Sequence, residues 1–233
     1  MKHGQRPAAD QSETDPRVLM DFPAFFDAAP AISLREPLAV FLGASGSGII
    51  TYGYADVVKL AGHSCPTVAG AYLMIRRGLV HLYGDGLPER GGVAVHLREA
   101  RDRGTTGVTA AVATLLTGAA AETGFGGIGA DHRFARRDLL HFGAAIDGLM
   151  ALRRLDTGRG VVLDLNAATV PPHPQMTRLF PKAAAGAASE DEQARFAALW
   201  QDRVARMLLE HADDPRLVHV REWDTAFSPE RAS

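Results

Sequence analysis

The sequence predicts an α+β fold, in which a mixed or antiparallel sheet packs against a pair of helices rich in small residues. Three observations support this prediction. Strand-like and helix-like segments do not alternate regularly, as they would in a Rossmann layout. Two apolar segments, beginning at Pro66 and Thr106, contain many glycines and alanines, so their helices could pack closely together. A longer amphipathic segment follows Ser189 and predicts a helical extension at the C-terminal end.

The composition indicates a globular protein of the cytoplasm. Apolar residues make up 46% of the 233 residues and charged residues 22%, which suits a chain that buries its own core. The single cysteine cannot form an internal disulfide, so a reducing compartment is expected. The polar N-terminus lacks the apolar core of a signal peptide, and no apolar stretch is long enough to span a membrane. The net charge of -2 gives no reason to expect nucleic acid or an anionic membrane as a partner.

The chain divides into three predicted parts. Residues 1–16 are polar and charged, and they predict a disordered tail. Residues 17–170 contain strand-like and helix-like segments joined by glycine-rich turns, and they predict the α+β core. Residues 171–233 begin with a proline-rich turn and contain the long amphipathic segment, so they predict the C-terminal helical extension.

The first half of the chain predicts short strands separated by helices. Asp21 is expected to cap a short helix that begins at Phe22. Strands are predicted where apolar and β-branched residues run together, over 38–42, 49–54 and 93–97. The glycine-rich segment 43–48 lacks the Gly-Lys-Ser/Thr ending of a P-loop, so it is interpreted as a plain turn. A helical turn is expected over 56–60 and a long helix over 66–83.

The second half predicts further strands and the longest helix. Thr106 is expected to cap an alanine-rich helix. Strands are predicted over four segments: 136–142, 144–154, 160–166 and 217–223. The first two of these could pair as a hairpin around Gly143. A weak helix is expected over 176–184, and a stronger one starts at Ser189, where Glu192 completes a capping box.

The only cysteine, Cys65, is the strongest candidate for chemistry. Proline is favoured at the first position of a helix, so Pro66 makes Cys65 the expected N-cap. The helix dipole favours the thiolate there, which attacks electrophiles and binds soft metals. In an extended segment residues i and i+2 point the same way, so His63 and Cys65 are predicted to face one ligand or metal. Zinc, or another soft divalent metal, accepts both donor types.

Two ligands do not complete such a site, because a catalytic zinc usually takes three protein groups and a water. The sequence does not choose the third from its candidates, which are Asp56, His96, Glu122, His132 and His141. The absence of a second cysteine excludes a structural zinc knuckle. The competing interpretation is that Cys65 is a buried small hydrophobe that never reacts. The arginines at 133, 136 and 137 predict either a grip on a carboxylate or phosphate or a solvated strand face.

The region around Cys65 resembles a signature of the FmdE-like family of formylmethanofuran dehydrogenase subunits. The family signature is His-Gly-His-x-Cys-Pro-Gly…Gly-Tyr/Arg. The corresponding residues here are Ala61-Gly62-His63-Ser64-Cys65-Pro66, followed by Ala69-Gly70-Ala71-Tyr72. Asp56 matches an acidic position often seen shortly before that signature, and Thr106-Gly107-Val108-Thr109 resembles a second element, Thr-Gly-Cys-Thr. The resemblance covers roughly residues 36–150. It implies an α+β core that tends to dimerise, with a His/Cys cleft thought to hold a metal, usually zinc.

Together these points define the expected site. His63 and Cys65 would bind the metal and act as the catalytic groups, and Asp56 would orient the histidine or add an oxygen ligand. A small-molecule ligand or cofactor would be bound by Thr106 and Thr109 on the opposite wall, and by Arg136. The expected oligomer is a homodimer.

The sequence also departs from the family pattern. Ala61, Thr67 and Val108 stand where the family has His, Gly and Cys, which removes up to two possible metal ligands. The helix from Ser189 occupies the place of the family's cysteine-rich zinc finger, and no binding motif for molybdopterin or an iron–sulfur cluster is present. Two alternatives therefore stay open: a ligand- or cofactor-binding accessory module of a redox system without its own turnover, and a purely structural dimer.

Overall fold

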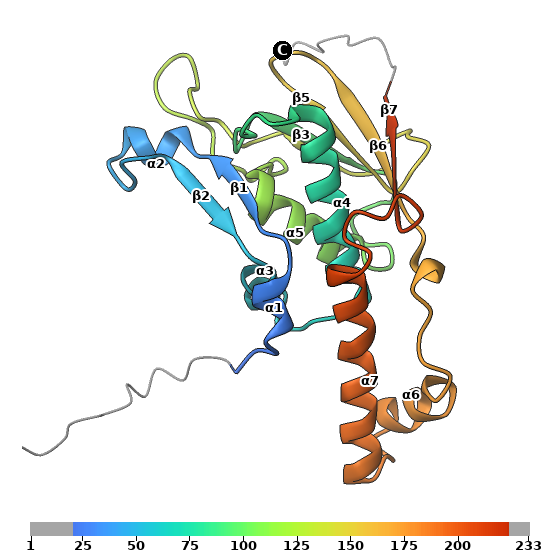
Figure 1. The fold of residues 1–233 in the computed structure, drawn as a ribbon. Coiled ribbons are helices and arrows are strands. Elements are labelled where there is room, and N and C mark those ends of the chain that lie inside the picture. Colours follow the sequence, from blue (N-terminus) through green and yellow to red (C-terminus); the bar gives the residue numbers. More distant parts are fainter. Residues whose placement is uncertain (1–20, 224–233) are drawn as a thin grey trace, which may run out of the picture.

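The computed structural model describes residues 21–223, so the tail predicted for residues 1–16 lies outside the described residues. Its helices are α1 (Phe25–Ala28), α2 (Pro37–Phe41), α3 (Tyr54–Ala61), α4 (Pro66–Tyr83), α5 (Thr106–Thr117), α6 (Met176–Ala184) and α7 (Glu190–Leu209), with a short 3-10 turn at Ala167–Thr169 (Figure 1). Its strands are β1 (Ile32–Arg35), β2 (Ile49–Tyr52), β3 (Val93–Leu97), β4 (Leu140–His141), β5 (Met150–Arg154), β6 (Gly160–Leu165) and β7 (Val218–Glu222). The predicted α+β class is confirmed.

The centre of the fold is a five-stranded mixed sheet in the order β4-β3-β5-β6-β7. Strand β4 runs parallel to β3, and every other neighbouring pair in this sheet is antiparallel. A separate antiparallel ribbon of β1 and β2 stands beside the main body (Figure 1). The mixed sheet agrees with the sequence prediction.

The two helices rich in small residues pack against each other as predicted. Helix α4 lies against β5, β6 and β7, and α5 and α7 flank it (Figure 1). The bounds of α4 match the predicted 66–83, because Pro66 starts the helix and Gly84 ends it. Its buried side includes Tyr72, Leu73 and Ile75, each fully inaccessible to solvent, so α4 is the centre of the hydrophobic core.

The strand predicted over 38–42 is wrong, because the segment forms helix α2. Pro37 occupies the first helical turn, and the Glu36 carboxylate accepts the Leu38 N–H at 3.1 Å, which caps the helix. A five-residue apolar run does not distinguish a strand from a helix by its period. The residues before the apolar segment, Glu36 as the cap and Pro37 in the first turn, therefore favour a helix over a strand.

The hairpin predicted around Gly143 is also wrong. Of the two predicted strands, only Leu140–His141 and Met150–Arg154 are extended, and they lie on opposite sides of β3 instead of pairing with each other. Residues 130–139 form turns, with positive φ angles at His132, Phe134 and Asp138. Such left-handed residues interrupt a strand, which explains why the first predicted strand shrinks to two residues.

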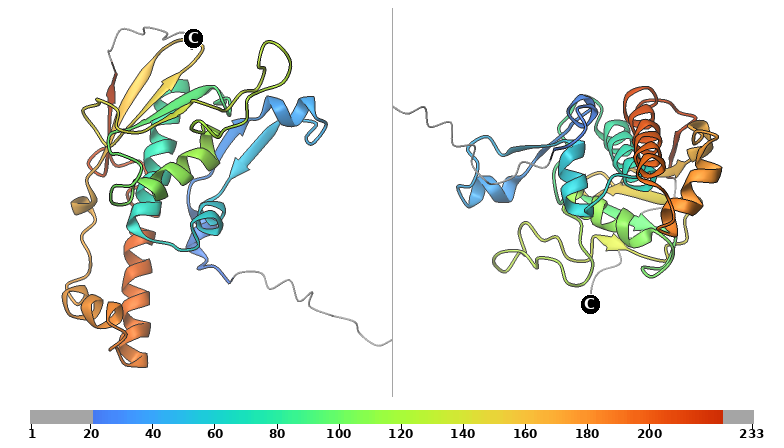
Figure 2. Two further views of the ribbon diagram at one scale, coloured as in Figure 1. Left: turned by 180° about the vertical axis from the view of Figure 1, so that it is seen from behind. Right: turned by 90° about the horizontal axis from the view of Figure 1, so that it is seen from below.

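The C-terminal segment contributes both to the helical extension and to the sheet. Ser189 and Glu192 form the predicted capping box of α7. Figure 2 shows α6 and the adjoining part of α7 projecting beyond the end of the sheet. The chain then returns as β7, which pairs with β6 and forms one edge of the sheet. None of the helices within residues 21–223 combines the length and the hydrophobicity that crossing a membrane requires.

Candidate functional site

Cys65 occupies the position that the sequence predicts, at the N-terminus of α4. Its backbone is extended, with φ −153° and ψ 167°, and Pro66 begins the helix. The Sγ atom accepts the Val68 N–H at 3.5 Å, so the thiol satisfies one of the free donors of the first turn. Cys65 is partly buried and packs against the edge of the core. Its N-cap role is confirmed.

His63 and Asp56 are both held by local hydrogen bonds. The exposed His63 places Nδ1 2.9 Å from the carbonyl oxygen of Ala61, so Nδ1 donates and Nε2 is left as the acceptor. The Asp56 carboxylate accepts the Gly53 N–H at 3.0 Å and pairs with Lys59 at 3.2 Å. Asp56 is thus the capping carboxylate of α3, which sequence reasoning did not anticipate.

The donor set around Cys65 does not fit a three-ligand zinc site. No three His, Cys, Asp or Glu residues come close enough within residues 21–223 to hold a metal ion together. The other candidates have partners elsewhere: the His96 and His141 rings stack on each other, His132 pairs with the Gly126 carbonyl, and Glu122 pairs with Arg101. His63 and Cys65 therefore remain two donors, two residues apart in the sequence, without a third among the described residues.

Helix α7 fixes the short segment between His63 and Cys65. The Ser64 carbonyl accepts hydrogen bonds from Trp200 Nε1 at 3.1 Å and from Gln201 Nε2 at 3.2 Å. The Ser64 hydroxyl lies 3.1 Å from the phenol oxygen of Tyr54. Burial raises the pKa of Tyr54 well above its ordinary value, so this phenol stays neutral at physiological pH. The segment before α4 is thus tied to both α3 and α7.

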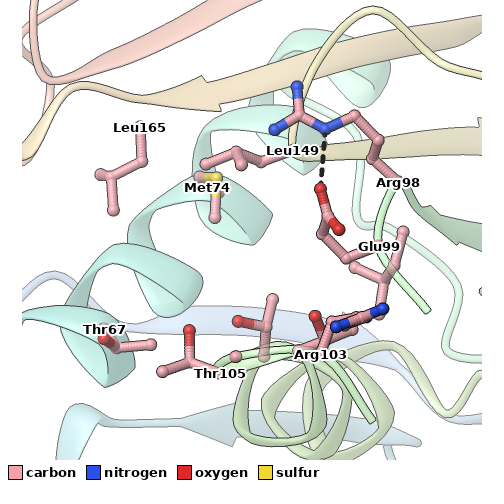
Figure 3. A pocket seen from close by; sticks show the side chains of 12 residues that line it. Thr67, Met74, Arg98, Glu99, Arg103, Thr105, Leu149 and Leu165 are labelled. Atoms are coloured by element: carbon pink, nitrogen blue, oxygen red, sulfur yellow. Dashed lines mark hydrogen bonds and ion pairs between the residues drawn. The ribbon is translucent and has the colours of Figure 1, made fainter. Parts of the chain in front are cut away.

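A cleft of about 390 Å³ opens beside the first turn of α4 (Figure 3). It lies between the N-terminal turns of α4 and α5, the connection from β3 to α5, and the chain around β5 and β6. One wall is apolar and is formed by Met74, Leu97, Leu149 and Leu165. Figure 3 shows Met74, Leu149 and Leu165 on the side of the cleft opposite Thr67 and Thr105. Cys65 and His63 do not line the cleft, although Thr67, on the same first turn, does.

The lining also includes four threonines: Thr67, Thr105, Thr106 and Thr109. Their hydroxyl groups have no hydrogen-bond partner among residues 21–223. Thr106 is only 9% exposed, but its hydroxyl oxygen keeps some accessible surface. Because Thr106 lines the cleft, this oxygen reaches the cleft. The structure brings together the two predicted residues Thr106 and Thr109. Thr67 and Thr105 were missed, although each stands at the start of one of the two paired helices.

Three charged side chains line one side of the cleft (Figure 3). Arg98 and Glu99 form a long ion pair at 3.4 Å, and Arg103 contributes a second guanidinium. The side chain of Arg103 has no partner in the described part of the chain. Its neighbour Arg101 instead pairs with Glu122 and is not part of the lining. No sequence signal marks Arg103 as a site residue, because an arginine in a polar turn is usually solvated.

Arg136, expected to contact a cofactor, lies in a buried ion network and not in the cleft. Its guanidinium pairs with Glu36 at 2.5 Å and donates to the carbonyl of Arg90. Arg90 pairs with the other carboxylate oxygen of Glu36 at 2.9 Å. Burial lowers the pKa of Arg136, and the Glu36 carboxylate opposes this shift. The network joins the base of α2 to the end of α5 and the chain before β4.

No family model matches this chain, and no curated protein matches it either. The resemblance to the FmdE-like family, with the zinc site and homodimer that it implies, therefore stays a prediction. The cleft and the groups that line it are the ground for a functional proposal.

Proposed function

We propose that this chain is a small-molecule-binding protein whose ligand occupies the cleft between the N-terminal turns of α4 and α5. The observation behind the proposal is a cleft lined by apolar side chains and by four threonine hydroxyls that have no hydrogen-bond partner within residues 21–223. Ligand sites combine such apolar walls with a few directed polar groups, and their volumes are typically several hundred Å³. The volume of about 390 Å³ is in that range.

The lining favours binding without turnover. It consists of threonine hydroxyls, two guanidinium groups, one carboxylate and apolar side chains, with neither a histidine nor a cysteine among them. Nucleophilic catalysis relies on groups such as a cysteine thiolate, and acid–base catalysis on a histidine or a carboxylate beside the substrate. The one carboxylate of the lining, Glu99, is paired with Arg98. This composition supports the ligand-binding alternative over a hydrolytic or thiol-dependent reaction inside the cleft.

The test is ligand binding by a pair of matched variants. The double variant Thr106→Val/Thr109→Val removes two hydroxyls with little change of shape. Thr123→Val is the control, because Thr123 is exposed and does not line the cleft. Each lost hydrogen bond is worth about 1 kcal/mol, so the double variant should bind about tenfold more weakly or worse. Mass spectrometry of denatured protein would detect a retained compound, and ligand-observed NMR with small organic molecules would measure binding directly.

The control variant should match the wild type in both measurements. Binding that is equal in the wild type and the double variant would place the ligand elsewhere. The complete absence of binding by the wild type, in both assays, would refute the proposal.

A further inference from the structure

We propose that the ligand is an amphipathic carboxylate, and that its carboxylate binds at the N-terminus of α5, against Thr106 and Arg103. This inference rests on the proposed function, because it names the chemical class of the molecule in the same cleft. Three features of the described residues support it: a helix end without a side-chain cap, a hydroxyl of a buried residue without a protein partner, and a guanidinium without a protein partner.

The N-terminus of α5 has no side-chain cap. The side chain of its N-cap residue, Thr105, makes no capping hydrogen bond. Side chains cap α2, α4 and α7, from Glu36, Cys65 and Ser189, whereas the N-cap residues of α1, α3 and α6 make no side-chain capping hydrogen bond, as at α5. What distinguishes the start of α5 is that it lines the cleft. The first N–H groups of a helix lack partners within the helix, and the dipole of this 12-residue helix favours an anion there. An anionic ligand would supply the missing cap.

Thr106 adds a second and independent observation at this helix end. Its side chain is more than nine-tenths buried and its hydroxyl has no partner in the described residues, although it lines the cleft. Because the hydroxyl reaches the cleft, a group bound in the cleft can pair with it. A carboxylate oxygen would accept a hydrogen bond from this hydroxyl.

The charged side chains that line the cleft match a ligand with a single negative charge. Arg98 is paired with Glu99, whereas Arg103 has no counter-charge in the described part of the chain. Two guanidinium groups and one carboxylate leave one uncompensated positive charge in the lining. A carboxylate matches it, because a guanidinium binds a carboxylate through two parallel hydrogen bonds. The opposite wall of Met74, Leu149 and Leu165 accepts an apolar body attached to that group (Figure 3).

The experiment titrates the full-length protein with two matched series of probes by ligand-observed NMR. One series is straight-chain carboxylates from butanoate to decanoate, and the other is primary alcohols of the same chain lengths. At least one carboxylate should bind about tenfold more tightly than its matched alcohol, which corresponds to a charge-assisted hydrogen bond. Arg103→Gln and Thr106→Val should each remove most of that preference, and Arg103→Lys should restore part of it.

Arg101→Gln is the matched control, because Arg101 lies on the same turn but pairs with Glu122 outside the lining. It should leave the preference unchanged, and thermal melts of all variants would establish that they fold. If the alcohols bind as tightly as the carboxylates, the carboxylate inference fails while the cleft remains a ligand site. If no carboxylate binds at all, the inference also fails, and binding of other small molecules then decides the proposed function separately.

Discussion

The Cys65 thiol satisfies a structural need whether or not it also binds a metal. Its sulfur accepts a backbone N–H at the start of α4 in the way that serine or aspartate does at other helices. The adjacent His63 is exposed and keeps Nε2 available. A capping role and a metal-binding role therefore predict different behaviour for the same substitutions.

Urea denaturation of Cys65→Ser and Cys65→Ala, with and without added zinc, separates these two roles. Without zinc, the serine variant should be as stable as the wild type, because serine is a preferred N-cap, and the alanine variant should lose about 1 kcal/mol. A metal that binds only the folded state raises its stability. If His63 and Cys65 bind zinc, added zinc should stabilise the wild type. It should not stabilise Cys65→Ser, Cys65→Ala or His63→Ala.

If zinc changes the stability of all four proteins equally, His63 and Cys65 do not bind it. If zinc stabilises the wild type alone, the two donors bind metal with help from water or another molecule. A drop of equal size in the serine and alanine variants without zinc would contradict the capping role.

The residues of the candidate site were predictable where a local signal marked them. Pro66 identified Cys65 as an N-cap, and the resemblance of residues 106–109 to a family element pointed to Thr106 and Thr109. Arg136 was assigned to a cofactor because its partner is not visible in the neighbouring sequence: Glu36 is 100 residues away. Only the folded chain shows that this arginine is buried and neutralised.

At the scale of elements, close packing of α4 on the sheet depends on its glycines. A Cβ added at Gly78 would lie 2.7 Å from a methyl of Leu152 and 3.0 Å from a methyl of Leu163, and both leucines are fully buried. A Cβ added at Gly70 would instead collide with Leu165, which lines the cleft and is only partly buried. The two glycines on one helix therefore predict different effects of the same substitution.

Gly78→Ala should destabilise the fold by about 1 kcal/mol, because overpacking of the core outweighs the gain in helix propensity. Gly70→Ala should cost less stability, since Leu165 can move into the cleft, but it should weaken binding of small molecules there. Urea denaturation and ligand-observed NMR on both variants would measure the two effects. If both variants are stabilised by about 1 kcal/mol, helix propensity alone governs these positions and the packing argument is wrong.

The sequence predicted the type of an element correctly where capping or turn residues marked its ends. Helix α4 lies between Pro66 and Gly84, and the capping box fixed the start of α7. The apolar segment of α2 was too short to show a helical period, so the pattern alone did not distinguish a helix from a strand. Strand β4 was overestimated because the sequence does not reveal the left-handed turns before it.

At the scale of the whole molecule, the C-terminal segment contacts the rest of the fold at two places. Helix α7 binds the Ser64 carbonyl beside the start of α4, and β7 forms the sheet edge next to β6. Trp223 follows β7 and lies against the His96 ring, with ring centroids 4.9 Å apart. The last described residues therefore cover a titratable group of the sheet, which couples global stability to pH.

His96 should make the folded state less stable as the pH falls through the weakly acidic range. Burial, and then the charges of His141 and Arg153, lower the pKa of His96 from 6.5 to about 4. The unfolded chain therefore binds a proton at a higher pH than the folded chain, and folding stability falls between about pH 6.5 and pH 4. The shift corresponds to at most about 3 kcal/mol.

His96→Phe should remove this loss, because phenylalanine keeps an aromatic ring beside His141 and Trp223 but does not titrate. Urea denaturation from pH 7.5 down to pH 4.5 isolates the effect, since carboxylates with lowered pKa values, such as Glu222, lose their contribution mainly below that range. His219→Gln, an exposed histidine on β7, is the control and should follow the wild type. Equal slopes for the wild type and His96→Phe would show that another group couples the fold to pH.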